Sequence, residues 1–206
     1  MSAPEFKPFP RSGYGLIYAD PPWAYRDKAN AGKRGACHKY GVLSMNEIAQ
    51  LDVQSIAAPD CVLAMWWVPP QPAEALALVE AWGFRLITMK GIEWIKTTKR
   101  GKFHFGMGHW TRANAESVLL AGRGAAMAAV DDLGLESESL LLAKRGKPRA
   151  VSHSVHQLVF AERGAHSAKP PEVADRLVEL VGPVKRIELF ARMRRDASWD
   201  YWGDQV

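Results

Sequence analysis

An acid, two prolines and a tryptophan follow one another at positions 20–23, directly after the apolar run 15–19. A short apolar run of this kind predicts a buried strand, so the motif is expected at a strand's carboxyl end. Open α/β sheets bind their ligands there. A simple strand-ending turn is the alternative, but the adjacent Trp23 favours a binding site.

Asp20, Pro21, Pro22 and Trp23 suit one reaction in particular, attack by the exocyclic amino group of adenine. That group is a poor nucleophile because its lone pair is delocalised into the ring. The Asp20 carboxylate and the Pro21 carbonyl can each accept a hydrogen bond from one of its two N–H groups, and the prolines stiffen the turn. Trp23 can stack on the base, which is worth about 1–3 kcal/mol. These four are therefore the candidate catalytic residues.

The elements that must position this motif can be predicted from patterning. A capping box at Ser44 and Glu47 predicts a helix to about residue 57. Further helices are expected at 72–82 and, with two prolines at its start, at 170–182. Apolar runs predict strands at 16–19, 61–68, 86–95, 118–121, 140–143, 157–161 and 186–190. The alternation predicts an α/β fold, a mostly parallel sheet with helices on both faces.

One stretch is duplicated: residues 116–124 (ESVLLAGRG) return as 138–146 (ESLLLAKRG). Two copies do not make a solenoid. We expect a single domain over residues 1–206, with 125–149 an inserted or duplicated segment. Only one copy is expected to occupy the strand position, and the sequence does not decide which.

Six ordered motifs resemble the MT-A70 family of S-adenosylmethionine-dependent adenine-N6 methyltransferases, in particular its bacterial and phage members. The family also includes the catalytic subunit of the mRNA adenosine methyltransferase. The resemblance covers about 16–205 and implies a Rossmann-like methyltransferase fold in circularly permuted order, with the strand at 187–190 on the cofactor side. The motifs are 19–23 (ADPPW), 39–41 (KYG), 94–96 (WIK), 106–116 (GMGHWTRANAE), 166–170 (HSAKP) and 187–192 (IELFAR).

The resemblance implies S-adenosylmethionine as methyl donor, S-adenosylhomocysteine as product, and no metal. It implies that Asp20 and Lys169 bind the cofactor, with Lys169 at its carboxylate. Arg192, Asp204 and Gln205 are implied on the ribose and adenine side. Asp204 departs from the asparagine of the family, although a carboxylate still accepts hydrogen bonds from ribose hydroxyls.

On the substrate side, the resemblance implies five residues around the acceptor adenine. For the two aromatic members, a place in the hydrophobic core is the alternative. The five are Tyr40, Trp94, Asn114, Glu116 and Ser167.

The net charge of +5 and pI near 9.3 suit a nucleic-acid partner. Two basic, glycine-containing segments, 25–40 and 96–112, are candidates for phosphate contacts, with ordinary solvated loops as the alternative. DNA is favoured over RNA from the small size and the bacterial-type motifs. The recognition sequence and the state of assembly, monomer, homodimer or heterodimer, stay open. A non-catalytic nucleic-acid-binding subunit of the same fold is the alternative function.

Other classes are disfavoured. The chain has no phosphate-binding G-x-x-x-x-G-K-[ST] loop, no complete dinucleotide fingerprint and no G-x-S-x-G elbow. Cys37 and Cys61 form no zinc pattern with His104 and His109, and we expect unpaired thiols that are dispensable for activity. No apolar stretch reaches the roughly 20 residues of a membrane span, so a cytoplasmic protein is expected.

Overall fold

The computed structural model describes residues 7–23, 44–69, 71–103, 137–164 and 168–206. Seven strands form one sheet in the order β5-β3-β4-β2-β1-β6-β7. The strands are β1 (Tyr14–Ala19), β2 (Ala57–Trp67), β3 (Arg85–Thr97), β4 (Ser137–Arg145), β5 (Leu158–Glu162), β6 (Arg186–Leu189) and β7 (Asp200–Trp202). The helices are α1 (Met45–Ala49), α2 (Val53–Ile56), α3 (Pro72–Ala81) and α4 (Pro171–Val181).

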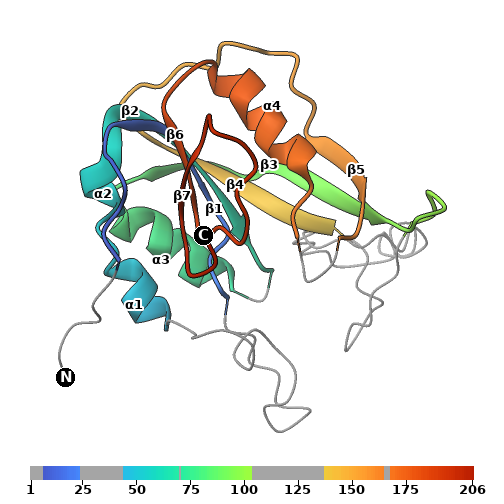
Figure 1. The fold of residues 1–206 in the computed structure, drawn as a ribbon, viewed down its shortest axis with the longest axis horizontal. Coiled ribbons are helices and arrows are strands. Elements are labelled where there is room, and N and C mark those ends of the chain that lie inside the picture. Colours follow the sequence, from blue (N-terminus) through green and yellow to red (C-terminus); the bar gives the residue numbers. More distant parts are fainter. Residues whose placement is uncertain (1–6, 24–43, 70, 104–136, 165–167) are drawn as a thin grey trace, which may run out of the picture.

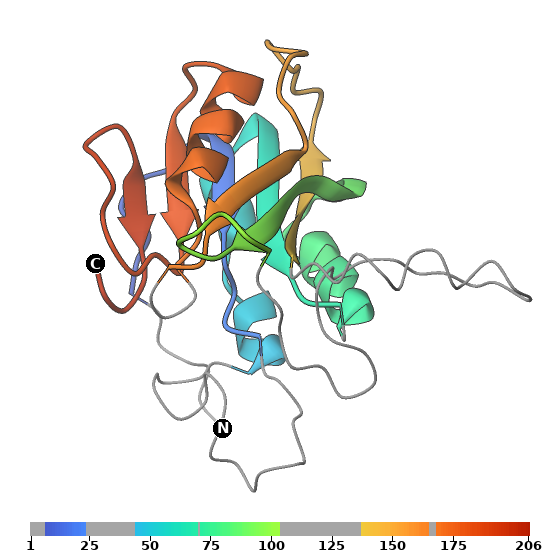
Figure 2. The same ribbon diagram turned by 90° about the vertical axis from the view of Figure 1, so that its right-hand side faces the viewer.

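The sheet is covered on both faces, as Figures 1 and 2 show. Successive side chains of β1 point to opposite faces: Ile17 joins the core beneath α1, α2 and α3, and Leu16 joins the core beneath α4. Both central strands, β1 and β2, are therefore apolar along almost their whole length, as expected for strands buried on two sides. The predicted α/β fold is confirmed.

The sheet is mixed. Strand β1 runs parallel to β2 and β6, and the pairs β3–β5 and β6–β7 are also parallel. Strand β4 is antiparallel to both of its neighbours, β2 and β3. It is built from the second copy of the repeated stretch, whereas the first copy lies outside the described residues. The insertion at 125–149 stays a prediction, but its part from 137 to 145 is an inner strand of the sheet.

The predicted helices start where expected. The Ser44 hydroxyl accepts from the Glu47 N–H at 3.2 Å, and the Glu47 carboxylate accepts from the Ser44 N–H at 2.6 Å. The helix expected to reach residue 57 is instead broken into α1 and α2. The break follows from Asp52, whose side chain accepts from the Ser55 N–H and caps a new helix.

The turn after β4 requires a glycine. Gly146 has φ +66°, and a Cβ there would lie 2.2 Å from the Pro59 carbonyl oxygen and 2.3 Å from Asp60 Oδ1. We expect Gly146→Ala to lower the free energy of unfolding by about 3 kcal/mol, from left-handed backbone strain together with overpacking. Urea denaturation measures this loss.

Gly101 provides the matched control. Its φ is +70°, but a Cβ there would meet no atom within 4 Å. Gly101→Ala should therefore show the backbone strain alone, about 1 kcal/mol. Equal losses in the two variants would mean that the close approach of residue 146 to residues 59 and 60 does not contribute to the loss of unfolding free energy.

Candidate active site

The candidate site lies where β1 and β6 end side by side. The two strands are parallel, and the Asp20 N–H donates to the Leu189 carbonyl at 3.4 Å. From these ends the chain departs in opposite directions, from β1 through α1 and α2 to β2, and from β6 to β7. In open α/β sheets, a reversal of this kind marks the edge at which ligands bind.

Four charged side chains of alternating sign meet at this edge of the sheet. Lys169 Nζ lies 2.9 Å from Asp20 Oδ2 and 3.0 Å from Glu138 Oε2. The other oxygen of that glutamate, Oε1, lies 2.8 Å from Lys96 Nζ. We call these four residues the charge cluster. They come from four separate segments: the end of β1, the turn before α4, β4 and β3.

Two members of the charge cluster, Lys169 and Glu138, are held in their ionised forms by their neighbours. Burial alone would lower the pKa of Lys169, but Asp20 and Glu138 outweigh it and raise that pKa above its ordinary value. Burial alone would raise the pKa of Glu138, but Lys169 and Lys96 outweigh it and hold it below its ordinary value. The site therefore carries a fixed cation between two carboxylates at neutral pH.

The sequence pointed to half of this cluster. Asp20 and Lys169 were predicted, and the structure brings them into direct contact. Glu138 and Lys96 were missed as site residues. Lys96 stood in the W-I-K motif without a role, and Glu138 was visible only as the counterpart of Glu116 in the repeat. That correspondence was the signal that could have found it.

Trp23 is held inside the fold. Its side chain is 5% exposed, and its indole Nε1 donates to the Trp66 carbonyl at 3.0 Å. The Pro21 carbonyl accepts from the Trp23 N–H at 2.9 Å, which uses one of its two lone pairs. These contacts fix the turn that carries Asp20, a structural role that the sequence did not reveal. Stacking of Trp23 on a base stays a prediction.

The predicted substrate residues have different outcomes. Trp94 is fully buried in the core, which was the alternative considered for it, and its indole donates to the Ala161 carbonyl at 3.0 Å. The Lys96 ammonium lies 5.3 Å from the centroid of its ring, so Trp94 borders the charge cluster. A role in the acceptor pocket stays a prediction. Four further predicted residues lie outside the described residues: Tyr40, Asn114, Glu116 and Ser167.

The predicted cofactor residues of the C-terminal region lie at two adjoining strand ends. Arg192 follows β6, and Asp204 and Gln205 follow β7, all three exposed. The Ala191 N–H donates to the Trp202 carbonyl at 3.0 Å, which ties the two ends together. Such donors and acceptors suit a ligand with hydroxyl and carboxylate groups.

The backbone at these ends is tight. Phe190 has φ +60°, uncommon for a residue other than glycine, and such conformations cluster at functional sites. Gly203 approaches so closely that a Cβ would lie 2.4 Å from the Ala191 carbonyl oxygen. This packing leaves no room for a side chain between the two strand ends.

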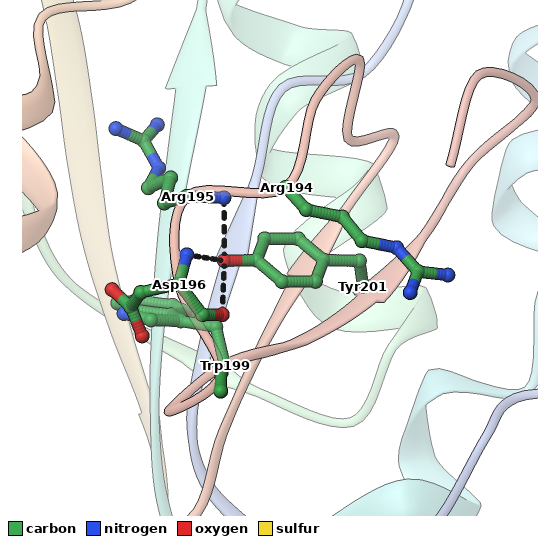
Figure 3. Close-up of a pocket in the computed structure, with 6 residues that line it drawn as sticks. Arg194, Arg195, Asp196, Trp199 and Tyr201 are labelled. Atoms are coloured by element: carbon green, nitrogen blue, oxygen red, sulfur yellow. Dashed lines mark hydrogen bonds between the residues drawn. The ribbon is translucent and has the colours of Figure 1, made fainter.

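A separate cavity of about 420 Å³ lies in the loop between β6 and β7 (Figure 3). The Tyr201 hydroxyl organises it by accepting from the N–H groups of Arg195 and Asp196, at 2.8 and 3.0 Å, and donating to the Asp196 carbonyl. The Arg195 side chain leaves this loop to pair with Glu188 at 2.9 Å. The lining residues are Arg194, Arg195, Asp196, Ala197, Trp199 and Tyr201. No motif in the sequence predicts this cavity.

The described part of the chain contains neither a clustered metal site nor a membrane-spanning helix. No group of three or more His, Cys, Asp or Glu side chains is arranged there to hold a metal ion. None of the helices there has the length and apolar character needed to cross a membrane.

Comparison with known proteins gives a family match over residues 14–205, to the family model MT-A70. The chain is 33% identical over 217 residues to the type II methyltransferase M.MunI of a Mycoplasma species, covering 98% of this chain and 81% of that protein. It is 25% identical over 201 residues to the human N(6)-adenine-specific methyltransferase METTL4, covering 95% of this chain and 38% of that protein. An N(6)-adenosine-methyltransferase MT-A70-like protein of Arabidopsis thaliana is 24% identical over 196 residues, which are 94% of this chain and 24% of that relative.

Proposed function

Because the chain belongs to the MT-A70 family, we propose that it transfers a methyl group from S-adenosylmethionine to the N6 amino group of adenine in DNA. DNA is favoured by the bacterial-type motifs. It is also favoured because the match to the Mycoplasma type II methyltransferase covers 98% of this chain and 81% of that protein. The observation that carries the proposal is the direct contact between Asp20 and Lys169 at the end of β1, 2.9 Å between Nζ and Oδ2.

Asp20 has the chemistry that the reaction requires. Its side chain is 22% exposed, so a ligand can reach it although most of it is withdrawn from water. In such surroundings a carboxylate that accepts a hydrogen bond from the adenine amino group binds it more strongly than it would in water. The lone pair of N6 is thereby made available for attack, and no covalent bond to the protein is needed.

Lys169 and the residues that follow β6 and β7 fit the methyl donor. S-adenosylmethionine supplies an activated methyl group bound to a sulfonium. Lys169, with 9% of its side chain exposed, is a cationic donor for a carboxylate. Arg192, Asp204 and Gln205 supply donors and acceptors for ribose hydroxyls. Together they would orient the donor toward Asp20, and orientation is the chief source of rate in a direct transfer.

Cys61 is expected to be dispensable. Its side chain is fully buried, and burial raises the pKa of its thiol to about 12, so that almost no thiolate exists at neutral pH. Cys61→Ala should leave the methyl-transfer rate at the wild-type value, measured with radiolabelled S-adenosylmethionine and corrected for folded protein. A large loss of rate in folded Cys61→Ala would contradict direct transfer.

The experiment that tests the function uses the purified protein with S-adenosylmethionine and unmethylated DNA or RNA in parallel. Nucleoside digestion and mass spectrometry then measure N6-methyl-deoxyadenosine and N6-methyladenosine. The deoxynucleoside product is the expected result. The ribonucleoside product alone would correct the polymer, and silence in both arms with S-adenosylhomocysteine bound would identify a non-catalytic subunit.

A further inference from the structure

The charge cluster contains a residue for which the reaction as described has no use. Glu138 contacts Lys169 and Lys96 at 3.0 and 2.8 Å, and its side chain is only 19% exposed. A buried carboxylate is costly unless it is paired. Glu138 meets two ammonium groups, one on each oxygen, so its position is fixed from two elements at once.

The proposed reaction makes a demand on this arrangement. Asp20 Oδ2 is bonded to Lys169 Nζ, and the same carboxylate must turn toward the amino group of adenine. A lysine that lost its only partner in a buried site would be an uncompensated charge. Lys169 avoids this because a second carboxylate, that of Glu138, remains within ion-pair distance.

We propose that Glu138 is a positioning residue for methyl transfer: its ion pair holds the Lys169 ammonium in place, so that Asp20 can turn to the amino group of adenine. Lys96 completes the arrangement by binding the other oxygen of Glu138. This proposal rests on the proposed function. It assigns to the second copy of the repeat, which forms β4, a role in the site itself.

The charged groups around the two central residues define the expected pH behaviour. Lys169 faces Asp20 after β1, Glu138 on β4 and, at longer range, Glu188 on β6. Glu138 faces Lys169 and Lys96. Removal of Glu138 lowers the pKa of Lys169, because burial is then opposed by one close carboxylate fewer. Removal of Lys96 raises the pKa of Glu138, because one opposing cation is lost.

The first test is Glu138→Gln, which keeps the shape and removes the charge. We expect kcat to fall by about 10–100-fold, the effect of misplaced reacting groups. The affinity for S-adenosylhomocysteine at neutral pH should change less than kcat, because Lys169 remains paired with Asp20. Activity needs the protonated lysine, so the alkaline limb of the pH–rate profile should move to lower pH.

Glu93→Gln is the matched control. Glu93 is also a partly buried, ion-paired carboxylate, 3.0 Å from Lys90. It lies on β3 directly before Trp94, the residue that pairs with Glu138 on β4. It makes no contact with Lys169. This variant should keep the wild-type rate and both limbs of the pH profile.

Lys96→Met provides a second variant that does not depend on the folding of Glu138→Gln. Activity needs Glu138 ionised, so the acid limb of the pH–rate profile of Lys96→Met should move to higher pH. In Glu138→Gln, by contrast, the alkaline limb moves to lower pH. A purely structural role of either residue would lower the melting temperature without moving a limb. Folding of each variant is checked by circular dichroism.

A readout independent of turnover separates the two proposals. NMR titration of isotope-labelled lysine, with the Lys169 signal assigned through Lys169→Arg, should give a lower midpoint in Glu138→Gln than in wild type. Wild-type kcat, unmoved limbs and an unmoved midpoint would overturn the role of Glu138. Absence of methylated adenine with wild-type protein would overturn the proposed function, while the NMR midpoints still decide whether Glu138 holds Lys169.

Discussion

Asp20→Asn is expected to slow methyl transfer to adenine by about a hundredfold or more, which corresponds to about 3 kcal/mol of lost transition-state stabilisation. Asparagine keeps the shape of the side chain and one acceptor oxygen but removes the charge. The neutral amide then stabilises the positive charge that develops on N6 less than the carboxylate does. Single-turnover rates at saturating S-adenosylmethionine measure the chemical step directly.

The same variant separates chemistry from binding. Lys169 keeps its contact with Glu138 at 3.0 Å when Asp20 loses its charge, so affinity for S-adenosylhomocysteine should fall much less than the rate. Calorimetry measures that affinity. A near-wild-type single-turnover rate in folded Asp20→Asn would exclude the carboxylate as the acceptor. A parallel collapse of rate and affinity would mean that the residue mainly holds the cofactor.

Lys169→Met is expected to weaken S-adenosylhomocysteine binding by about 10–100-fold, since a hydrogen bond to a charged group contributes about 1.5–3 kcal/mol. It should also destabilise the protein, because Asp20 and Glu138 then lose the cation between them. Breaking a buried pair from one side costs about 3–5 kcal/mol. Calorimetry and urea denaturation measure the two effects.

The pH dependence of Lys169→Met follows from the same contacts. In wild type, Lys169 helps to hold the pKa of Glu138 below its ordinary value. A lowered carboxyl pKa stabilises the fold above the ordinary pKa, and this stabilisation is lost as pH falls through the folded-state pKa. The variant should therefore differ most from wild type at neutral pH and approach it in acid.

Lys147→Met is the control for these two effects, because Lys147 is an exposed lysine just beyond the other end of β4. It should keep both affinity and stability. Unchanged ligand affinity in folded Lys169→Met would remove Lys169 from the cofactor site.

The sequence predicted the parts of the fold that local patterns determine. Ser44 and Glu47 start α1 by a capping box, and α4 starts at the second of two paired prolines; both starts depend on neighbours within four residues. Strand β7 was not predicted, because three residues are too few to show a period. The division of α1 from α2 depends on the side chain of Asp52, which competes with the helix for backbone donors.

The site was predicted where a motif carries it and missed where only tertiary pairing does. Asp20 and Lys169 lie in motifs, and the family resemblance implied that both bind the cofactor; their direct contact is a finding of the structure. Glu138 enters the site because β4 pairs with β3 opposite Trp94, and no local pattern in the sequence states that pairing. The burial of Trp23 was hidden for the same reason, since its partner Trp66 belongs to β2.

The placement of β1 between β2 and β6 has a consequence while the chain is being synthesised. The contact between Lys169 and Asp20 spans 149 residues, and at about 5–20 residues per second a ribosome needs about 7–30 s to make them. Strand β2 is available to β1 early, whereas β6 appears only after Lys169. During that interval the other edge of β1 has no strand beside it, so the nascent chain presents an apolar template for wrong pairing. Expression at lower temperature or with added chaperones should therefore raise the yield of folded protein more than any change of buffer after lysis.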